Sequence, residues 1–240
     1  MRRIGRVVEC PSPRASIRSI VNIYDRLLGA FGPQRWWPAK TAFEVIVGAI
    51  LTQATNWSNV EQAIAGLRKT NALSPRKILS IRTSRLERLI RPSGYFRQKA
   101  RRLKDFSSWY LKRYGGKSSR MFRTPWPDLR RELLDLKGIG PETADSILLY
   151  AGGQPIFVVD TYTKRVLGRH RMVAPRMTYP EIQRLVMEER LPEPAKFYNE
   201  FHALIVAVGK KFCHRYNPTC AFCPLGDLPK TSEVRINGCR

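Results

Sequence analysis

The sequence is poor in acidic residues for its length. Its 240 residues include 19 Asp and Glu against 43 Lys and Arg, which gives a formal net charge of +24. A surface this basic repels itself unless a polyanion is bound, and the phosphate backbone of a nucleic acid is the commonest polyanion. An anionic membrane is the alternative partner, but the basic residues are spread along the chain. The charge therefore favours a nucleic acid.

Long apolar runs are also missing. No stretch approaches the roughly 20 apolar residues of a spanning helix, so the sequence predicts no transmembrane segment and no membrane partner. The Arg-rich stretch 1–18 lacks the apolar core of a secretory signal. We interpret this stretch as a basic tail, with an organellar transit peptide as the alternative.

Cysteine is scarce and odd in number, with Cys10, Cys213, Cys220, Cys223 and Cys239. An odd count without a signal peptide argues against a disulfide scaffold and for a reducing compartment. We therefore expect a reducing compartment, the cytoplasm. Separate expectations are a nucleoid-associated protein of prokaryotic type and a monomer.

The sequence is rich in helical periodicity. Apolar residues at Ile20, Ile23, Leu27 and Leu28 form one stripe of a helix, and similar stripes recur along the chain. The expected helices are 17–31, 43–51, 56–68, 74–80, 84–90, 98–114, 126–134, 162–168, 179–189 and 197–211. The segment 156–159 is predicted as a short strand or as an extended entry into the next helix. The predicted fold class is all-α, with short connections and two helical lobes.

The segment 136–144 (LKGIGPETA) predicts a helix, a tight turn and a second helix. Gly138 and Gly140 give the turn backbone freedom and let another backbone approach closely. Pro141 suits the first helical position, and Glu142 complements the positive end of the helix. Free N–H groups at a helix N-terminus suit a phosphate, although an ordinary packing corner between two helices has a similar pattern.

A Gly/Pro-rich loop at 152–155 (GGQP) follows, and then the segment 157–162 (FVVDTY). In this order the hairpin, the loop and Asp160 resemble the signature of the helix-hairpin-helix, Gly/Pro-rich–Asp superfamily of DNA glycosylases, the endonuclease III relatives. The resemblance covers roughly residues 40–225. It implies two helical lobes, with double-stranded DNA and an extruded damaged base meeting in the cleft between them.

The same resemblance implies a division of the chain and a set of DNA contacts. One lobe is expected from residues 1–41 and 156–212, a helical barrel lobe with the hairpin from 42–155, and a metal-cluster loop and tail from 213–240. In the segment 50–55 (ILTQAT), Gln53 corresponds to a Gln that enters the gap left by a flipped base. The expected DNA-binding residues are Gln53, Lys137, Gly138, Ile139, Gly140 and Thr143.

Asp160 fits the chemistry of base removal independently of the family. Cleavage of an N-glycosidic bond builds positive charge on the sugar, and a fixed carboxylate stabilises that charge and can orient or deprotonate water. An Asp in this context is otherwise most often a helix N-cap, here before 161–165, and the two roles are compatible. We predict Asp160 as the catalytic residue.

Glu142 distinguishes between two branches of the family. Glycosylases that also cut the strand use a lysine amine, which forms a Schiff base with the sugar. In the endonuclease III pattern that lysine lies two residues after the second hairpin glycine, where this sequence has Glu142. A carboxylate cannot form a Schiff base, and Lys137 precedes the turn, where it is expected to face the DNA backbone. We therefore predict a monofunctional glycosylase without AP lyase activity.

The segments 36–38 (WWP) and 91–100 (RPSGYFRQKA) resemble those of the 3-methyladenine glycosylases of the endonuclease III type. In that group, aromatics at the positions of Trp36, Trp37 and Trp57 sandwich the flipped base. An alkylated purine is positively charged, so stacking on Trp faces gains cation–π energy that a neutral base lacks. Without this context, paired tryptophans are more often packing residues. The basic residues expected to contact phosphates are Arg97, Lys99, Arg101 and Arg102.

Cys213, Cys220 and Cys223 have the spacing of the first three ligands of the endonuclease III [4Fe–4S] loop. The family's fourth ligand falls at Pro229 here, and the only later cysteine is Cys239. The resemblance implies a structural [4Fe–4S] cluster, with Cys239 as the displaced fourth ligand. A three-ligand cluster, zinc with His214, or no metal are the alternatives.

These features predict a base-excision DNA glycosylase that acts on alkylated purines of the 3-methyladenine type by base flipping. A glycosylase for oxidised pyrimidines or for mismatched thymine is the alternative within the same class. A non-catalytic protein that binds DNA lesions is the alternative from another class, and Asp160 argues against it.

Overall fold

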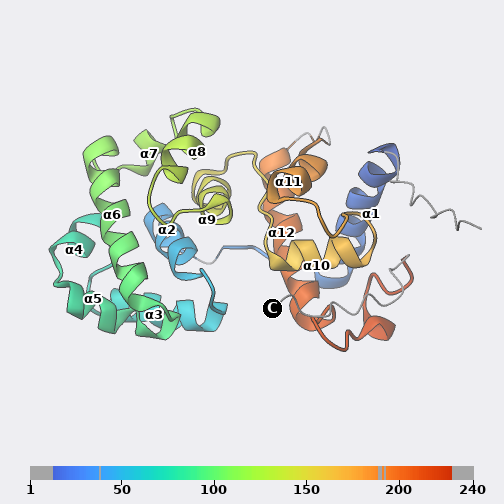
Figure 1. Ribbon diagram of the computed structural model, residues 1–240, viewed down its shortest axis with the longest axis horizontal. Helices are drawn as coiled ribbons and strands as arrows, with labels where there is room; N and C mark the ends of the chain where they lie inside the picture. The colour runs from blue at the N-terminus through green and yellow to red at the C-terminus, as the bar shows by residue number, and fades with distance from the viewer. Residues whose placement is uncertain (1–12, 38, 189–190, 192, 229–240) are drawn as a thin grey trace, which may run out of the picture. The chain divides into compact units, whose positions relative to one another are not determined.

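The computed structural model describes residues 13–37, 39–188, 191 and 193–228. Every regular element in these ranges is helical, and none of them is a strand (Figure 1). The predicted all-α fold class is confirmed, and the segment 156–159 is extended without forming a strand. Within the same ranges, no helix has the length and apolar character needed to cross a membrane.

The expected helices are present, with ends that differ by a few residues, and the short helices at 91–93, 118–121 and 220–222 were not expected. They are α1 (Pro13–Phe31), α2 (Ala42–Leu51), α3 (Trp57–Lys69), α4 (Pro75–Ser80), α5 (Thr83–Leu89), η1 (Arg91–Ser93), α6 (Phe96–Tyr114), α7 (Ser118–Met121), α8 (Trp126–Leu134), α9 (Pro141–Ser146), η2 (Ile147–Ala151), α10 (Thr161–Arg169), α11 (Tyr179–Met187), α12 (Pro194–Lys211) and η3 (Cys220–Phe222).

Short polar side chains fix where several helices begin. Thr41, Asn56 and Ser74 precede α2, α3 and α4, and each side chain accepts a hydrogen bond from the N–H group three residues later. Such caps satisfy backbone donors that a helix leaves free, and each contributes about 1 kcal/mol.

The chain divides into two compact units. The first comprises Met1–Gln34, Val159–Pro192 and Phe201–Arg240, and the second comprises Arg35–Val158 and Glu193–Glu200. The expected division placed the boundaries at 41/42 and 155/156 and treated the cysteine loop as a separate part. The described part of that loop, residues 213–228, groups with the first unit, and residues 193–200 group with the second.

The second unit is built around α2. Its side chains from Phe43 to Leu51 are all buried, and α2 packs against α3, α6, α9 and η2. Apolar side chains on every face of a helix require cover on every face, so the sequence places α2 in the core.

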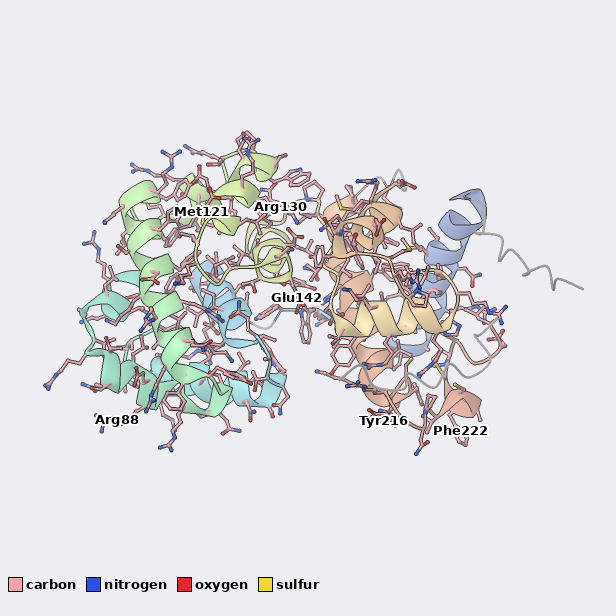
Figure 2. All side chains as sticks on the ribbon, in the orientation of Figure 1. Arg88, Met121, Arg130, Glu142, Tyr216 and Phe222 are labelled. Carbon is pink, nitrogen blue, oxygen red and sulfur yellow. The ribbon has the colours of Figure 1, made fainter. Side chains whose placement is uncertain are left out.

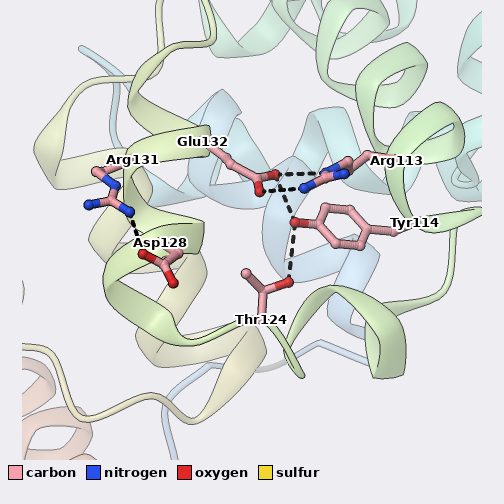
Figure 3. Close-up of polar contacts among 6 residues, drawn as sticks. All are labelled: Arg113, Tyr114, Thr124, Asp128, Arg131 and Glu132. Atoms are coloured by element: carbon pink, nitrogen blue, oxygen red, sulfur yellow. Dashed lines mark hydrogen bonds and ion pairs between the residues drawn. The ribbon is translucent and has the colours of Figure 1, made fainter.

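Two polar clusters fasten the hairpin helices to their neighbours. Glu132 of α8 accepts hydrogen bonds from Arg113 (3.2 Å) and from the hydroxyl of Tyr114 (2.8 Å), both on α6 (Figure 3). On the other side of α8, Arg130 donates to both carboxylate oxygens of Asp145 in α9, at 2.6 and 3.1 Å. Asp145 is fully buried. The hairpin is therefore held by charge-assisted bonds as well as by apolar packing.

In the first unit, α10 packs closely against α12. The hydroxyl-bearing ring of Tyr162, on α10, lies so close to Gly209 of α12 that a Cβ there would approach the ring to 2.4 Å. Arg165 extends from α10 to donate to the carbonyl oxygens of Cys213 (2.7 Å) and Gly209 (3.1 Å). These bonds satisfy carbonyls at the C-terminal end of α12 and fix the start of α10, which follows Asp160.

Candidate active site and nucleic-acid interface

The two glycines of the hairpin turn differ in backbone conformation and in the space around them. Gly138 has φ of +87°, and a Cβ there would lie 2.3 Å from Nε of Arg102. Gly140 has an ordinary φ of −94°, and a Cβ there would meet nothing within 4 Å. The fold itself therefore requires a glycine at position 138, whereas at position 140 it leaves open space beside the N-terminus of α9.

The side chain of Gln53 is bonded to the hairpin. Its Nε2 donates to the carbonyl oxygen of Gly138 (3.0 Å) and to Oγ1 of Thr143 (2.9 Å), and its Oε1 accepts from the guanidinium of Arg102. Both ends of the amide are thus used within the protein. The structure brings together Gln53, Gly138 and Thr143, three of the expected DNA-binding residues.

The other expected DNA-contact residues differ in exposure. Lys137 is exposed, whereas the side chain of Ile139 is buried and its N–H donates to the carbonyl oxygen of Leu136 (3.0 Å). The interpretation of Lys99 as a phosphate contact is wrong. Lys99 is fully buried, and its Nζ donates to the carbonyl oxygens of Leu51 (2.8 Å) and Ser93 (2.6 Å). Burial and the nearby charge of Arg102 lower the pKa of Lys99 to about 8. Lys99 joins the end of α2, just before Gln53, to the turn that precedes α6.

Trp36, Trp37 and Trp57 form one aromatic cluster in the second unit. The ring centroids of Trp37 and Trp57 lie 4.8 Å apart, and Trp36 lies 5.7 Å from Trp37 and 5.6 Å from Trp57. The three interplanar angles are between 47° and 89°, so no two of the rings are parallel. In this conformation the rings contact one another and leave no parallel slot for a base.

Two residues that the sequence did not single out complete this cluster. The ring of Tyr150 lies 5.1 Å from that of Trp37, and a Cβ on Gly48 would approach the Trp37 ring to 2.9 Å. Gly48 of α2 thus makes room for the indole, and Tyr150 of η2 borders it. Nε1 of Trp37 is buried and has no hydrogen-bond acceptor among the described residues.

Asp160 lies at the N-terminus of α10 and is its N-cap. Oδ1 accepts hydrogen bonds from the backbone N–H (2.7 Å) and the hydroxyl (3.0 Å) of Thr163. Oδ2 faces His202 of α12, whose Nε2 lies 3.6 Å away. The Asp160 side chain is 13% exposed and that of His202 is 8% exposed. One carboxylate oxygen is thus committed to the helix, and the other faces a buried imidazole.

The surroundings of Asp160 favour the charged carboxylate. Burial alone would raise the pKa of Asp160, but the facing His202 and the hydrogen bonds from Thr163 outweigh burial and hold that pKa below its usual value. Asp160 therefore remains a carboxylate at neutral pH. A fixed, largely dehydrated carboxylate can stabilise a cation that forms beside it and can orient water.

The three described cysteines lie at the end of α12 and in the loop that follows. Sγ of Cys213 accepts a hydrogen bond from Arg169 (3.0 Å), and a Cβ on Gly226 would lie 2.3 Å from the carbonyl oxygen of Cys220. The loop is therefore tightly folded. In the part of the chain that the structure describes, no three Cys, His, Asp or Glu side chains lie close enough to hold a metal ion. Cys239 lies outside the described residues.

Comparison with known proteins identifies the class to which these features belong. A family model described as the HhH-GPD superfamily of base excision DNA repair proteins matches residues 47–192, more than half of the chain. The chain belongs to this superfamily, as the hairpin and Asp160 predicted.

Individual relatives agree with this assignment. The chain is 46% identical to a Methanocaldococcus jannaschii protein provisionally named a DNA repair glycosylase, over 87% of this chain and 94% of the relative. It is 30% identical to endonuclease III from Thermotoga maritima, over 75% of this chain and 79% of the relative. Among solved structures, it is similar to an H. pylori 3-methyladenine DNA glycosylase bound to 1,N6-ethenoadenine. That similarity has a TM-score of 0.70 and 30% identity, and covers 82% of this chain and 97% of that one.

Proposed function

We propose that this protein is a monofunctional DNA glycosylase that removes alkylated purines, of the 3-methyladenine type, from double-stranded DNA. One observation carries the proposal. Asp160 is held as a carboxylate in a dehydrated position, while the second residue of α9 is an exposed carboxylate, Glu142, where the endonuclease III pattern has an amine. The reaction then uses water as the nucleophile and leaves the strand intact.

Lys99 and Lys137 are the other lysines considered for the Schiff base, and neither is proposed to form it. Lys99 has the lowered pKa typical of a nucleophilic lysine, but its side chain is fully buried and its Nζ is bonded to two carbonyl oxygens. Lys137 is exposed and precedes Gly138, on the side of the turn away from α9. A Schiff base requires an accessible neutral amine beside the sugar, which Lys99 does not offer.

The reaction follows from the properties of Asp160. As the N-glycosidic bond breaks, the bonding electrons leave with the purine and positive charge develops on the sugar. The Asp160 carboxylate stabilises that charge and orients a water molecule toward C1′. The water oxygen bonds to C1′ and its proton passes to the Asp160 carboxylate and then to solvent, which gives a free base and an abasic site.

The tryptophan cluster is proposed to receive the extruded base. A positively charged alkylpurine gains cation–π energy on an indole face, which a normal base does not. The buried N–H of Trp37 would find an acceptor in a ring nitrogen of the base. Because the rings now contact one another, entry of a base requires at least one of Trp36, Trp37 and Trp57 to move. The similarity to the H. pylori enzyme, which was solved with a modified adenine, supports a purine.

Gln53 is proposed to fill the gap that the extruded base leaves. To do so it must exchange its bonds with Gly138, Thr143 and Arg102 for bonds with DNA. Each such bond contributes only about 1 kcal/mol net, because the freed groups at this partly exposed position regain water or phosphate as partners. A phosphate at the turn would meanwhile be anchored by Lys137, Gly138 and Gly140. The N–H of Ile139 is already bonded to the carbonyl oxygen of Leu136.

Base release from defined duplexes tests the proposal. The protein is incubated with duplexes that carry 3-methyladenine, 1,N6-ethenoadenine, thymine glycol or a G·T mismatch. We expect release of the free alkylated purine, with strand cleavage only after added alkali. Preferred release from thymine glycol or the mismatch would assign one of the alternative glycosylase activities. Strand cleavage without alkali would overturn the monofunctional mechanism, and tight lesion binding without release would identify a lesion-binding protein.

We further propose that Cys213, Cys220 and Cys223 hold a [4Fe–4S] cluster together with Cys239. Thiolates are the ligands that such clusters use, and the three cysteines lie in the segment 213–223, at the end of α12 and in the loop after it. In the described conformation these side chains do not lie close enough to hold a metal, so binding of a cluster would require the loop to bring them together. The cluster would hold the loop after α12 in place and take no part in base removal. Iron and sulfide analysis of anaerobically purified protein, with the C239S variant as the comparison, tests this assignment. Zinc without sulfide would contradict it.

A further inference from the structure

A hollow on the surface of the second unit is lined mainly by arginines. It lies at α4 and α5, has a volume of about 440 Å³, and is lined by Ser80, Ile81, Arg82, Ser84, Arg85 and Arg88. We refer to these six residues as the arginine hollow. The side chains of Arg82, Arg85 and Arg88 are all exposed.

The charge of the arginine hollow is not neutralised by the described part of the protein. No carboxylate within the described ranges forms an ion pair with Arg82, Arg85 or Arg88. The carbonyl oxygens at the end of α4 are also occupied. Nζ of Lys104 bonds to those of Ile78 (3.1 Å), Leu79 (2.9 Å) and Ile81 (2.7 Å). The hollow therefore presents guanidinium and hydroxyl donors, which match the oxygens of phosphate groups.

The arginine hollow and the hairpin turn lie on different sides of α6. Arg102 of α6 covers Gly138 in the hairpin, whereas Lys104 bonds to the end of α4. Two residues along an α-helix correspond to a rotation of about 200°. In Figure 2, Arg88 and Glu142 are labelled in well-separated parts of this unit. A duplex bound at the hairpin turn therefore leaves the arginine hollow open.

We propose that the arginine hollow binds the phosphate backbone of a second DNA segment while the hairpin engages the first. Ile81 is the only apolar residue in the lining, so a folded protein partner would find no apolar anchor there. A phosphate backbone needs only cations and hydrogen-bond donors. With two separate DNA surfaces, the protein can pass from one segment to another without complete dissociation.

A binding experiment without catalysis tests the proposal. The protein is saturated with a duplex that carries a stable abasic-site analogue, and a fluorescent undamaged duplex is then added. We expect the wild type to bind the second duplex and R82A/R85A/R88A to bind it roughly tenfold or more weakly. The slope of log K against log salt should fall by about 2 to 3, since each lost phosphate contact removes about 0.9.

A charge-matched variant provides the control. K112A/K117A/R123A removes the same number of positive charges from exposed positions of the same unit that do not line the hollow. This control should bind both duplexes within about twofold of the wild type.

The proposal is overturned by any of three results. The saturated wild type binds no second duplex, the control variant loses binding of the second duplex to the same extent, or an acidic peptide or single-stranded RNA displaces the second duplex more effectively than DNA does.

Discussion

Gln53 and Asp160 are both polar side chains held by hydrogen bonds of the protein itself, but in different surroundings. Gln53 is partly exposed, and its neutral amide is bonded to Gly138, Thr143 and Arg102. Asp160 is charged and 13% exposed, and it is bonded to Thr163 and faced by His202. A neutral amide near water can exchange partners cheaply, whereas a dehydrated charge cannot lose its partners without a large penalty. The Gln53 side chain is therefore suited to exchange its partners, and the Asp160 side chain is suited to stay fixed.

The largest expected effect comes from the D160N variant. Its amide oxygen can still accept from the N–H of Thr163, so α10 should begin normally, but the negative charge is lost. We expect the single-turnover rate of base release to fall about 10³-fold, with duplex affinity and melting temperature nearly unchanged. D160A, which also removes the cap, should lose about 1 kcal/mol of stability in addition. Base release by D160N at the wild-type rate would contradict the assignment of Asp160.

The next largest effect concerns the stability of the hairpin. Arg130 is the bidentate partner of the fully buried Asp145, so R130M leaves a buried charge without its ion pair and should lower the free energy of unfolding by about 3 kcal/mol. R131M is the matched control, because the ion pair between Arg131 and Asp128 is exposed and should contribute less than about 0.5 kcal/mol (Figure 3). Equal urea midpoints for the two variants would refute this difference.

The two hairpin glycines give a smaller and more selective effect. G138A places a Cβ against Arg102 at positive φ and should lower the free energy of unfolding by about 2 kcal/mol. The Cβ of G140A would lie in open space, so this variant should change the free energy of unfolding by only a few tenths of a kcal/mol. Because the space at Gly140 is proposed to admit a phosphate, G140A should nevertheless weaken duplex binding. Normal DNA affinity in G140A would remove that role from the position.

The smallest expected effect is the pH dependence that Lys99 imposes on stability. The folded protein releases the Lys99 proton near pH 8, whereas the unfolded chain keeps it until about pH 10.5. Between these values the unfolded state binds more protons, so the free energy of unfolding rises with pH, by about 1 kcal/mol from pH 7 to pH 9. Urea unfolding across this range should show the rise in the wild type and its loss in K99M. Parallel curves for the two proteins would contradict the lowered pKa.

The sequence predicted the elements whose signals are local. Helix α8 was expected at 126–134 and spans Trp126–Leu134, because its apolar spacing and the glycines after it are contiguous in the chain. The hairpin and Asp160 could be identified because they follow one another within a short segment of the chain. The family that they indicated is confirmed. The sequence also allowed Asp160 to be an N-cap, which the structure shows.

The partners of the candidate site could not be predicted in this way. Gln53 and Arg102 are 49 residues apart in the chain, and no local pattern pairs them. Lys99 was interpreted as exposed because lysine usually is, and its burial depends on two carbonyl oxygens that only the folded chain supplies. Tyr150 was overlooked because its position beside Trp37 depends on the geometry of η2, which helical periodicity does not reveal.

The π-helical turn of η2, at Ile147–Ala151, has a consequence for the length of the chain. A π-turn accommodates one more residue than the corresponding turn of an α-helix. Deletion of a single residue here would allow a regular α-helix in which the flanking residues keep their register, and it would change the position of Tyr150 relative to Trp37. In this stretch an insertion or deletion therefore changes the residue beside the tryptophans while the helix on either side is preserved.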